Sequence, residues 1–361
     1  MLNKMELNRA LLERQLLLKR VNMPAYNAIE RLVGIQSQTP NSAYFALWTR
    51  LLNFSKEELA TLINERRVVR IAMMRSTIHL VTDRHCLEYR PLLQPVLERS
   101  LKGNFGRFLK EIDINELVAV GRGMVEDQPR TLSDLGKMLN EYWTDRDPVA
   151  LANSIRNLVP LVQIPPRGIW GESGKALHTS AEVWLRKTLS KDSSLEEIIM
   201  NYLNAFGPAT VKDIQVWSGL TRLNEVIEKL RPRLCTFFDE QGNELFDLQD
   251  SPRPDSSTPV PPRFLAEFDN IILSYTDRTR IIKEEYQKLV FTKNGIIRAA
   301  VLIDGFVQGI WKIEKKTDTA TLNIKLFEPI SKEDYEALIE EGNNLLMFTA
   351  PGMTEHHIQI V

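Results

Sequence analysis

The 361-residue chain has little cysteine, no long apolar run and almost no net charge. Its two cysteines, Cys86 and Cys235, lie far apart and form no CxxC pair, so we expect neither a disulfide framework nor a zinc site. No segment approaches the roughly 18 apolar residues of a membrane span, and the first residues lack the apolar core of a signal peptide. We therefore expect a cytoplasmic protein without a metal ion or other cofactor.

The net charge of −1 hides an asymmetry along the chain. Residues 1–110 carry 18 Lys and Arg against 9 Asp and Glu, whereas residues 111–361 carry 28 against 38. A local excess of positive charge attracts nucleic-acid phosphates whatever the total charge of the chain. The solvated faces of ordinary helices carry the same residues, so charge alone leaves both interpretations open.

The most distinctive stretch is residues 31–52, RLVGIQSQTPNSAYFALWTRLL. Apolar residues recur at helical spacing over residues 25–35, which predicts a helix that ends at Gln36. Pro40 disfavours helical conformation in the residue before it, and the Asn-Ser pair that follows is suited to cap a second helix. The stretch therefore predicts two apolar helices with a break between them.

Two glutamines, Gln36 and Gln38, are expected at that break. An amide group both donates and accepts hydrogen bonds, so a pair of amides can hold a water molecule or a base edge in a fixed orientation. Most short motifs of this kind are plain helix-terminal surface residues, and the spacing alone does not decide between the two interpretations.

Three helices followed by a strand hairpin recur along the chain, which is the order of a winged helix. The pattern predicts an α+β fold of three tandem winged-helix modules followed by a mostly β, barrel-like domain. The second hairpin is expected from LVPLVQIPP and GIWGES, and the last domain is expected to begin with a strand at FLAEFDNIILSY. The expected divisions are a first module at 1–87, a basic helical connector at 88–112, a second module at 113–187, a third at 188–250, a Pro/Ser-rich linker at 251–262 and the β-rich domain at 263–361.

Basic residues gather in two places in the N-terminal half. Four arginines surround the first predicted hairpin, and a histidine lies in its second strand, where a hydrogen-bonded core residue is the commoner role. Three further cations alternate with Phe105 and Phe108, a pattern that suits contact with nucleic acid as well as ordinary helix packing. The candidate DNA-binding residues are Arg66, Arg67, Arg70, Arg75, His79, Lys102, Arg107 and Lys110.

Four runs spread over nearly the whole chain resemble the AlkZ-like (YcaQ-related) winged-helix DNA glycosylases. They are GIQSQTPNSAYFALWTRL, RIAMMRSTIHLVT, LVQIPPRGIWGESGKALHT and PRFLAEFDNIILSYTDRTRII. The resemblance implies three tandem winged helices around a DNA-binding concavity, with a QxQ or QxD motif that positions the hydrolytic water. Gln36 and Gln38 fall on this motif. Its middle residue is usually aliphatic or alanine in the family, whereas this chain has Ser37, a departure that affects local packing.

If the protein is a DNA glycosylase, as the resemblance implies, Gln36 and Gln38 are the expected catalytic residues. Hydrolysis of an N-glycosidic bond needs an activated water and stabilisation of an oxocarbenium-like sugar, roles that a carboxylate usually fills. Amides cannot act as bases near neutral pH, so we expect a substrate that leaves readily, namely a cationic alkylated purine of the N7-alkylguanine type. Crosslinked bases are a further candidate. The expected partner is double-stranded DNA carrying alkylated bases, bound by a nucleoid-associated monomer.

A non-catalytic DNA-binding regulator or lesion sensor is the alternative function. A winged helix typically reads duplex DNA with one helix in the major groove. Two neutral amides can also bind a base edge through paired hydrogen bonds without any chemistry.

Overall fold

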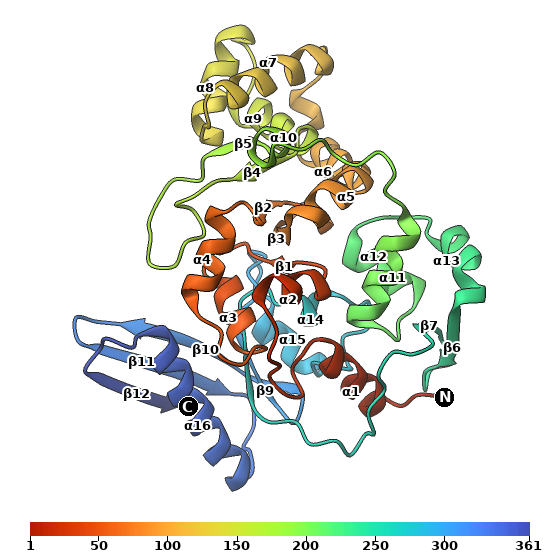
Figure 1. The fold of residues 1–361 in the computed structure, drawn as a ribbon, viewed down its shortest axis with the longest axis vertical. Coiled ribbons are helices and arrows are strands. Elements are labelled where there is room, and N and C mark those ends of the chain that lie inside the picture. The colour runs from red at the N-terminus through yellow and green to blue at the C-terminus, as the bar shows by residue number, and fades with distance from the viewer.

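The computed structural model describes residues 1–361 and shows a mixed α/β architecture around two five-stranded sheets (Figure 1). Its helices are α1 (Lys4–Arg14), α2 (Ala25–Arg31), α3 (Ser42–Trp48), α4 (Lys56–Asn64), α5 (Asp83–Leu92), α6 (Gln94–Phe105), α7 (Ile114–Asp127), α8 (Leu132–Tyr142), α9 (Pro148–Leu158), α10 (Ala181–Leu185), α11 (Leu195–Phe206), α12 (Val211–Ser218), α13 (Asn224–Leu230), α14 (Asn270–Leu273), α15 (Glu284–Val290) and α16 (Lys332–Thr349). Its strands are β1 (Ile35–Gln36), β2 (Val68–Ala72), β3 (Ile78–Thr82), β4 (Leu161–Gln163), β5 (His178–Ser180), β6 (Leu234–Phe238), β7 (Glu244–Leu248), β8 (Arg263–Leu265), β9 (Ala300–Ile303), β10 (Phe306–Lys315), β11 (Thr319–Leu326) and β12 (Glu355–Ile360). None of the helices is long and apolar enough to cross a membrane.

The first sheet has the strand order β1-β3-β2-β4-β5, and every neighbouring pair is antiparallel. It joins strands from two of the expected modules, because Arg70 and Ile71 of β2 pair with Gln163 and Val162 of β4. The β2–β3 hairpin therefore lies inside a sheet and does not project alone as a wing. Helices α7, α8 and α9 stand on one side of this sheet, at the top of Figure 1, with a small core of their own.

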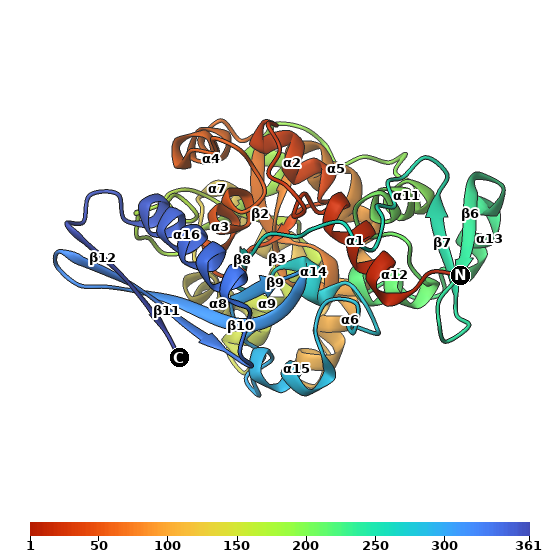
Figure 2. The ribbon, with the colours of Figure 1, turned by 90° about the horizontal axis from the view of Figure 1, so that it is seen from below.

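The second sheet has the order β12-β11-β10-β9-β8, with β11 and β12 parallel and the other pairs antiparallel. Its edge strands β8 and β12 do not pair, so the sheet is open and the expected barrel-like closure is wrong. The physical reason is that α16 packs against β11 and β12 and buries their apolar face (Figure 2). Strand β11 alternates buried and half-exposed residues, which is typical of a sheet covered on one side.

The structure differs from the secondary structure that the sequence predicts in two kinds of place: where the backbone adopts left-handed φ values, and where a short apolar run forms no strand. The helix expected over residues 25–35 ends at Arg31, because Val33 and Gly34 adopt φ values of +55° and +88° and lead the chain into β1. The glutamines are therefore not at a helix end. GIWGES forms no strand, since residues 164–177 are a loop and β4 pairs with β5. Residues 270–273, expected as strand, form α14.

One large apolar core connects most of the molecule. It contains 49 buried residues, from Leu11 in α1 to Val307 in β10, and it includes side chains of β2, β3, α11, α12 and α13. Separate domains joined by flexible linkers would each have a core of their own. The first and third expected modules and part of the C-terminal region are therefore fixed to one another by shared packing.

Buried ion pairs connect the N-terminal segment to distant parts of the chain. Arg14 and Asp247 are both fully buried and form two hydrogen bonds of 2.6 and 2.9 Å. Arg50 and Asp269 form a second two-point pair, at 2.9 Å for each bond. Arg14 also donates to the carbonyl oxygen of Pro252, 3.2 Å away, so the Pro/Ser-rich segment lies against α1. Breaking such a pair leaves a buried charge without compensation, which is costly.

We expect Asp247→Ala to destabilise the protein by about 3–5 kcal/mol, because Arg14 would stay buried without its carboxylate. Urea denaturation followed by circular dichroism measures this change. Glu336→Ala, which removes an exposed ion pair with Lys332 on α16, is the matched control and should leave the midpoint unchanged. Equal midpoints for the two variants would contradict the assigned role of the buried pair.

Stability should also fall in mild acid because three histidines are buried. Burial, with help from the neighbouring Arg75 and Arg84 charges, lowers the pKa of His79 and His85 to about 3, and burial lowers the pKa of His178 to about 4. The unfolded chain binds these protons near pH 6.5, so acid favours unfolding. Between pH 7 and pH 5 the free energy of unfolding should drop by up to about 1.4 kcal/mol per pH unit for each histidine. Urea midpoints measured across this range test the slope, and His85→Asn should make it shallower.

Candidate active site

The glutamine motif lies on a short edge strand of the first sheet. Ile35 and Gln36 of β1 pair with Leu80 and His79 of β3, and the backbone N–H of Ser37 donates to the carbonyl of Ile78 at 2.9 Å. Gly34 permits this approach, because a Cβ at its position would lie 2.7 Å from Cγ1 of Val81. Opposite residues of an antiparallel pair share a face, so Gln36 and His79 face the same side of the sheet.

The Gln36 side chain is held by Arg75. Gln36 is buried, and its Oε1 accepts a hydrogen bond of 2.6 Å from Nη2 of Arg75. A guanidinium can only donate, so this contact fixes which end of the amide is oxygen. The oxygen keeps a second lone pair, and no protein group accepts a hydrogen bond from Nε2. Gln36 thus offers an acceptor and a donor in one fixed orientation.

Gln38 is exposed and is fixed from the same hairpin. Its Oε1 accepts a hydrogen bond of 3.3 Å from the backbone N–H of Ile78 at the start of β3. Both amide oxygens are therefore oriented by the β2–β3 hairpin, Gln36 by a side chain at its tip and Gln38 by its backbone.

Ser37, the departure from the family motif, has a specific partner. Its hydroxyl oxygen accepts a hydrogen bond of 2.5 Å from Nη1 of Arg70 and donates to the carbonyl of Thr39 at 3.3 Å. Arg70 also donates to Oε1 of Gln163 at 3.2 Å. An aliphatic residue at position 37 could not accept from the guanidinium. The serine therefore fits a buried arginine in this chain.

Arg75 occupies the hairpin tip in an unusual backbone conformation. Arg75 and Ser76 both have left-handed φ values, +55° and +59°, which are uncommon for residues other than glycine. The guanidinium donates to the carbonyl of Trp217 in α12 and lies 3.4 Å from Oδ1 of Asn270 in α14, besides holding Gln36. Asn270 in turn donates to the carbonyl of Gly34 at 3.1 Å. One arginine thus contacts three separate parts of the chain.

Several arginines near the motif have no carboxylate partner. Burial, and secondarily the charge of Arg278, lowers the pKa of Arg75 to about 10, while burial and Arg167 do the same for Arg70. Burial also lowers the pKa of Arg156 and of Arg278. At neutral pH Arg70 and Arg75 remain charged. The region around the hairpin therefore carries positive charge that no acidic side chain neutralises, which attracts phosphate.

His79 is completely buried opposite Gln36. Its Nδ1 lies 3.0 Å from the carbonyl of Thr77, which implies the tautomer with hydrogen on Nδ1, and its Nε2 has no partner. Because the pKa is lowered to about 3, the ring is neutral at physiological pH. His79 does not offer a positive charge to a phosphate, and its position suits support of the strand beneath Gln36.

The other candidate DNA-binding residues form no single cluster. Arg66 and Arg67 lie in the turn directly before β2, away from the tip that carries Arg75; Arg66 stacks over Trp184 at 4.2 Å and Arg67 over Tyr26 at 4.6 Å. Lys102, Arg107 and Lys110 are exposed on and beyond the end of α6, and none pairs with a carboxylate. The helix itself packs against the hairpin tip and α9.

Sequence reasoning missed the residues that complete the site from elsewhere in the chain. Asn270 and Arg278 lie within the run PRFLAEFDNIILSYTDRTRII, so their place in a family-like run was the available signal. Asn157 accepts a hydrogen bond of 3.1 Å from the hydroxyl of Ser76, and Arg156 donates to the Ser76 carbonyl at 3.3 Å. Neither residue stands in a pattern that marks it as functional.

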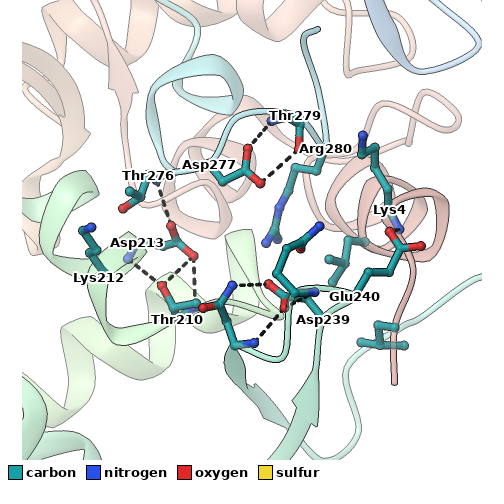
Figure 3. A pocket seen from close by; sticks show the side chains of 14 residues that line it. Lys4, Thr210, Lys212, Asp213, Asp239, Glu240, Thr276, Asp277, Thr279 and Arg280 are labelled. Carbon is teal, nitrogen blue, oxygen red and sulfur yellow. Dashed lines mark hydrogen bonds between the residues drawn. The ribbon is translucent and has the colours of Figure 1, made fainter. Parts of the chain in front are cut away.

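A separate polar pocket of about 250 Å³ lies between α12, the β6–β7 turn and residues 276–280 (Figure 3). Its acids already serve local structure. Asp213 caps α12 through Thr210 and accepts from the backbone N–H of Thr276, and Asp239 accepts from the backbone N–H groups of Gln241 and Asn243. No group of three or more His, Cys, Asp or Glu side chains is placed to hold a metal ion.

Comparisons with known proteins agree with the resemblance drawn from the sequence. A sequence model of the family described as DNA glycosylase AlkZ-like matches residues 29–348. The chain is 23% identical over 358 residues to the interstrand DNA cross-link repair glycosylase of Streptomyces sahachiroi, covering 88% of this chain and 91% of that protein.

A solved structure, Streptomyces sahachiroi DNA glycosylase AlkZ, matches with a TM-score of 0.78, 19% identity and 99% of each chain covered. At that identity the likeness establishes the fold from end to end. The family match itself spans most of the sequence. The chain belongs to the AlkZ-like family of DNA glycosylases.

Proposed function

We propose that the protein hydrolyses the N-glycosidic bond of cationic alkylated purines in double-stranded DNA, with a water positioned by Gln36 and Gln38. The observation that carries this proposal is the fixed orientation of the Gln36 amide by Arg75. Fixing an amide in advance removes the cost of orienting it during reaction.

The chemistry follows from the lone pairs of the two amide oxygens. Each oxygen accepts one hydrogen bond from the hairpin and can accept a second. A water that donates both its hydrogens to these oxygens directs its own lone pair outward, towards an anomeric carbon. The Arg75 contact makes the Gln36 oxygen a weaker acceptor, so the pair orients water without deprotonating it.

Because the two amides do not deprotonate the water, the substrate must carry a good leaving group. A water that stays neutral until late in the reaction needs a leaving group that departs easily, and a purine alkylated at N7 is already cationic. The relative from Streptomyces sahachiroi is named an interstrand cross-link repair glycosylase. We extend the proposal to crosslinked bases of the same N7-alkylguanine type, since their leaving-group chemistry is the same.

DNA binding is proposed to use three helix-and-hairpin units as winged-helix modules. These units are α2–α4 with β2–β3, α7–α9 with β4–β5, and α11–α13 with β6–β7. Lys102, Arg107 and Lys110 are proposed to contact phosphates, and Arg70 and Arg75 to supply the positive field beside the glutamines. A single chain carries all these parts, so we propose that a nucleoid-associated monomer is the working form.

A lesion sensor without catalysis is the second candidate. The exposed Gln38 and the unused donor of Gln36 also suit hydrogen bonding to a base edge. The two functions differ in what the glutamines affect: a sensor would lose affinity for damaged DNA when they are removed, whereas an enzyme would lose rate.

We expect Gln36→Ala and Gln38→Ala each to lower the single-turnover rate of base release by tens- to several-hundred-fold, with duplex affinity nearly unchanged. The oriented contact acts mostly in the transition state and is worth about 2–4 kcal/mol, by analogy with one oxyanion-hole donor. The assay measures release of 7-methylguanine from an N7-methylguanine duplex, with Gln241→Ala in the β6–β7 turn as control.

Because both glutamines act on one water, the double variant should cost less than the sum of the single effects. Gln38→Asp adds a base beside the forming cation and should keep or raise activity. Wild-type rates in both alanine variants would overturn the assignment, and lost affinity at unchanged rate would favour the sensor.

We expect Lys102→Glu and Arg107→Glu to weaken binding of damaged and undamaged duplex alike, because phosphate contacts carry no information on the base. Duplex affinity of the unaltered protein should fall steeply between 50 and 200 mM salt, and each lost contact should reduce the salt slope by about one. Fluorescence anisotropy measures both effects, with the exposed Lys332→Glu as control. A loss confined to damaged duplex would show that these residues read the lesion.

A further inference from the structure

A pocket of about 500 Å³ lies next to the glutamine motif, between the start of α3 and the second sheet. Thr39, which follows Gln38 in the chain, lines the pocket together with Glu267, and the two side chains are in hydrogen-bond contact. Much of the remaining wall is aromatic, formed by Phe45, Trp170 and Trp311. The volume is in the range of small-molecule sites and suffices for a single nucleobase.

The aromatic wall is rigid. The ring centroid of Phe45 lies 5.4 Å from that of Trp170 and 5.3 Å from that of Trp311, both in edge-to-face arrangements. The indole N–H of Trp311 donates to the carbonyl of Leu265 at 2.9 Å. Aromatic surfaces held in this way attract flat rings and cations.

Glu267 is a carboxylate without a cation of its own. The deeply buried carboxylates Asp247 and Asp269 each pair with an arginine, whereas the hydrogen bond to Glu267 comes from the hydroxyl of Thr39, at 3.1 Å. Two lysines also line the pocket: Lys312 pairs with Glu314, whereas Lys315 donates to the neutral carbonyl of Thr349 and keeps its charge. The half-buried Glu267 therefore forms no ion pair with a protein cation, and the exposed Lys315 is a separate positive charge at the rim.

The short segment of residues 267–270 connects this pocket to the glutamines. Phe268, directly after Glu267, has a left-handed φ of +59°, which is a genuine outlier for so bulky a residue. Two residues later Asn270 contacts Arg75, the partner of Gln36. Three residues span at most about 11 Å, so the carboxylate and the Gln36 network are close neighbours.

We propose that this pocket binds the cationic alkylated purine itself, with the ring against the aromatic wall and Glu267 as its counter-charge. The proposal rests on the proposed function for its substrate class and adds the site that recognises the charge. A neutral purine gains no charge–charge attraction from Glu267, so the pocket favours the methylated, cationic base over the ordinary one. The exposed lysines at the rim suit the phosphates beside it.

The test uses nucleosides and therefore does not depend on catalysis. Binding of 7-methylguanosine and of guanosine to the full chain carrying Gln36→Ala is measured by ligand-detected NMR titration. We expect 7-methylguanosine to bind at least tenfold more tightly. Adding Glu267→Gln, which keeps the shape and an acceptor for Thr39, should abolish that preference and leave guanosine binding unchanged.

Glu340→Gln is the matched control, since it removes an exposed carboxylate on α16 outside the pocket and should leave the preference intact. Equal binding of the two nucleosides, or a preference that survives Glu267→Gln, overturns the proposal. Phe45→Leu provides a second test of the pocket. Loss of the aromatic ring should weaken 7-methylguanosine binding, while the circular dichroism spectrum of the folded protein persists. Failure of the glutamine variants in the base-release assay would refute the hydrolysis mechanism and leave this pocket standing.

Discussion

The arrangement of the site depends on a single side chain, Arg75, and on the strained turn that carries it. Two consecutive left-handed residues at a hairpin tip cost of the order of 1–3 kcal/mol each, and such strain persists only where the surroundings impose it. Here the guanidinium contacts Gln36, the end of α12 and Asn270. Gly219 at the end of α12 allows this contact, because a Cβ there would lie 3.3 Å from the backbone of Arg75. The glutamine motif is thus completed by residues from three remote parts of the sequence.

The buried arginines around the Arg75 contacts show how the requirements of stability and of phosphate binding oppose each other. A buried arginine without a carboxylate loses hydration and gains little in return, which is why the pKa of Arg75 and of Arg70 falls to about 10. Where the protein needs stability alone, as at Arg14 and Arg50, the arginine receives an aspartate. The unpaired arginines near the motif keep their charge although they are buried or half-buried, and in the proposed function that charge adds to the positive field that DNA phosphates meet.

The sequence was informative wherever the signal is local. Thr131 and Ser331 are of the residue types that favour helix N-caps and they cap α8 and α16, Asp304 and Gly305 form the turn between β9 and β10, and Gly219 ends α12. The glutamines were found through a run of similar residues. Strand β1 could not be predicted, because two residues show no periodicity and the left-handed Val33 that begins the turn has no special residue type. The shared sheet, the contact of Arg75 with Asn270 and the open C-terminal sheet all arise from pairing between distant residues, which no local pattern records.

In the proposed mechanism the neutral glutamines, Arg75 and Glu267 have separate electrostatic roles. Gln36 and Gln38 are neutral and accept hydrogen bonds from the hairpin, so in the proposed mechanism they orient water without adding negative charge near the glycosidic carbon. The positive charge of Arg75 beside them opposes an oxocarbenium ion, and this opposition is tolerable when a phosphate lies between the two. Negative charge enters instead through Glu267, on the side where the pocket meets Thr39. In the proposed site a cationic base is attracted from that side before its bond breaks, which assigns recognition of the lesion and hydrolysis of its bond to different side chains.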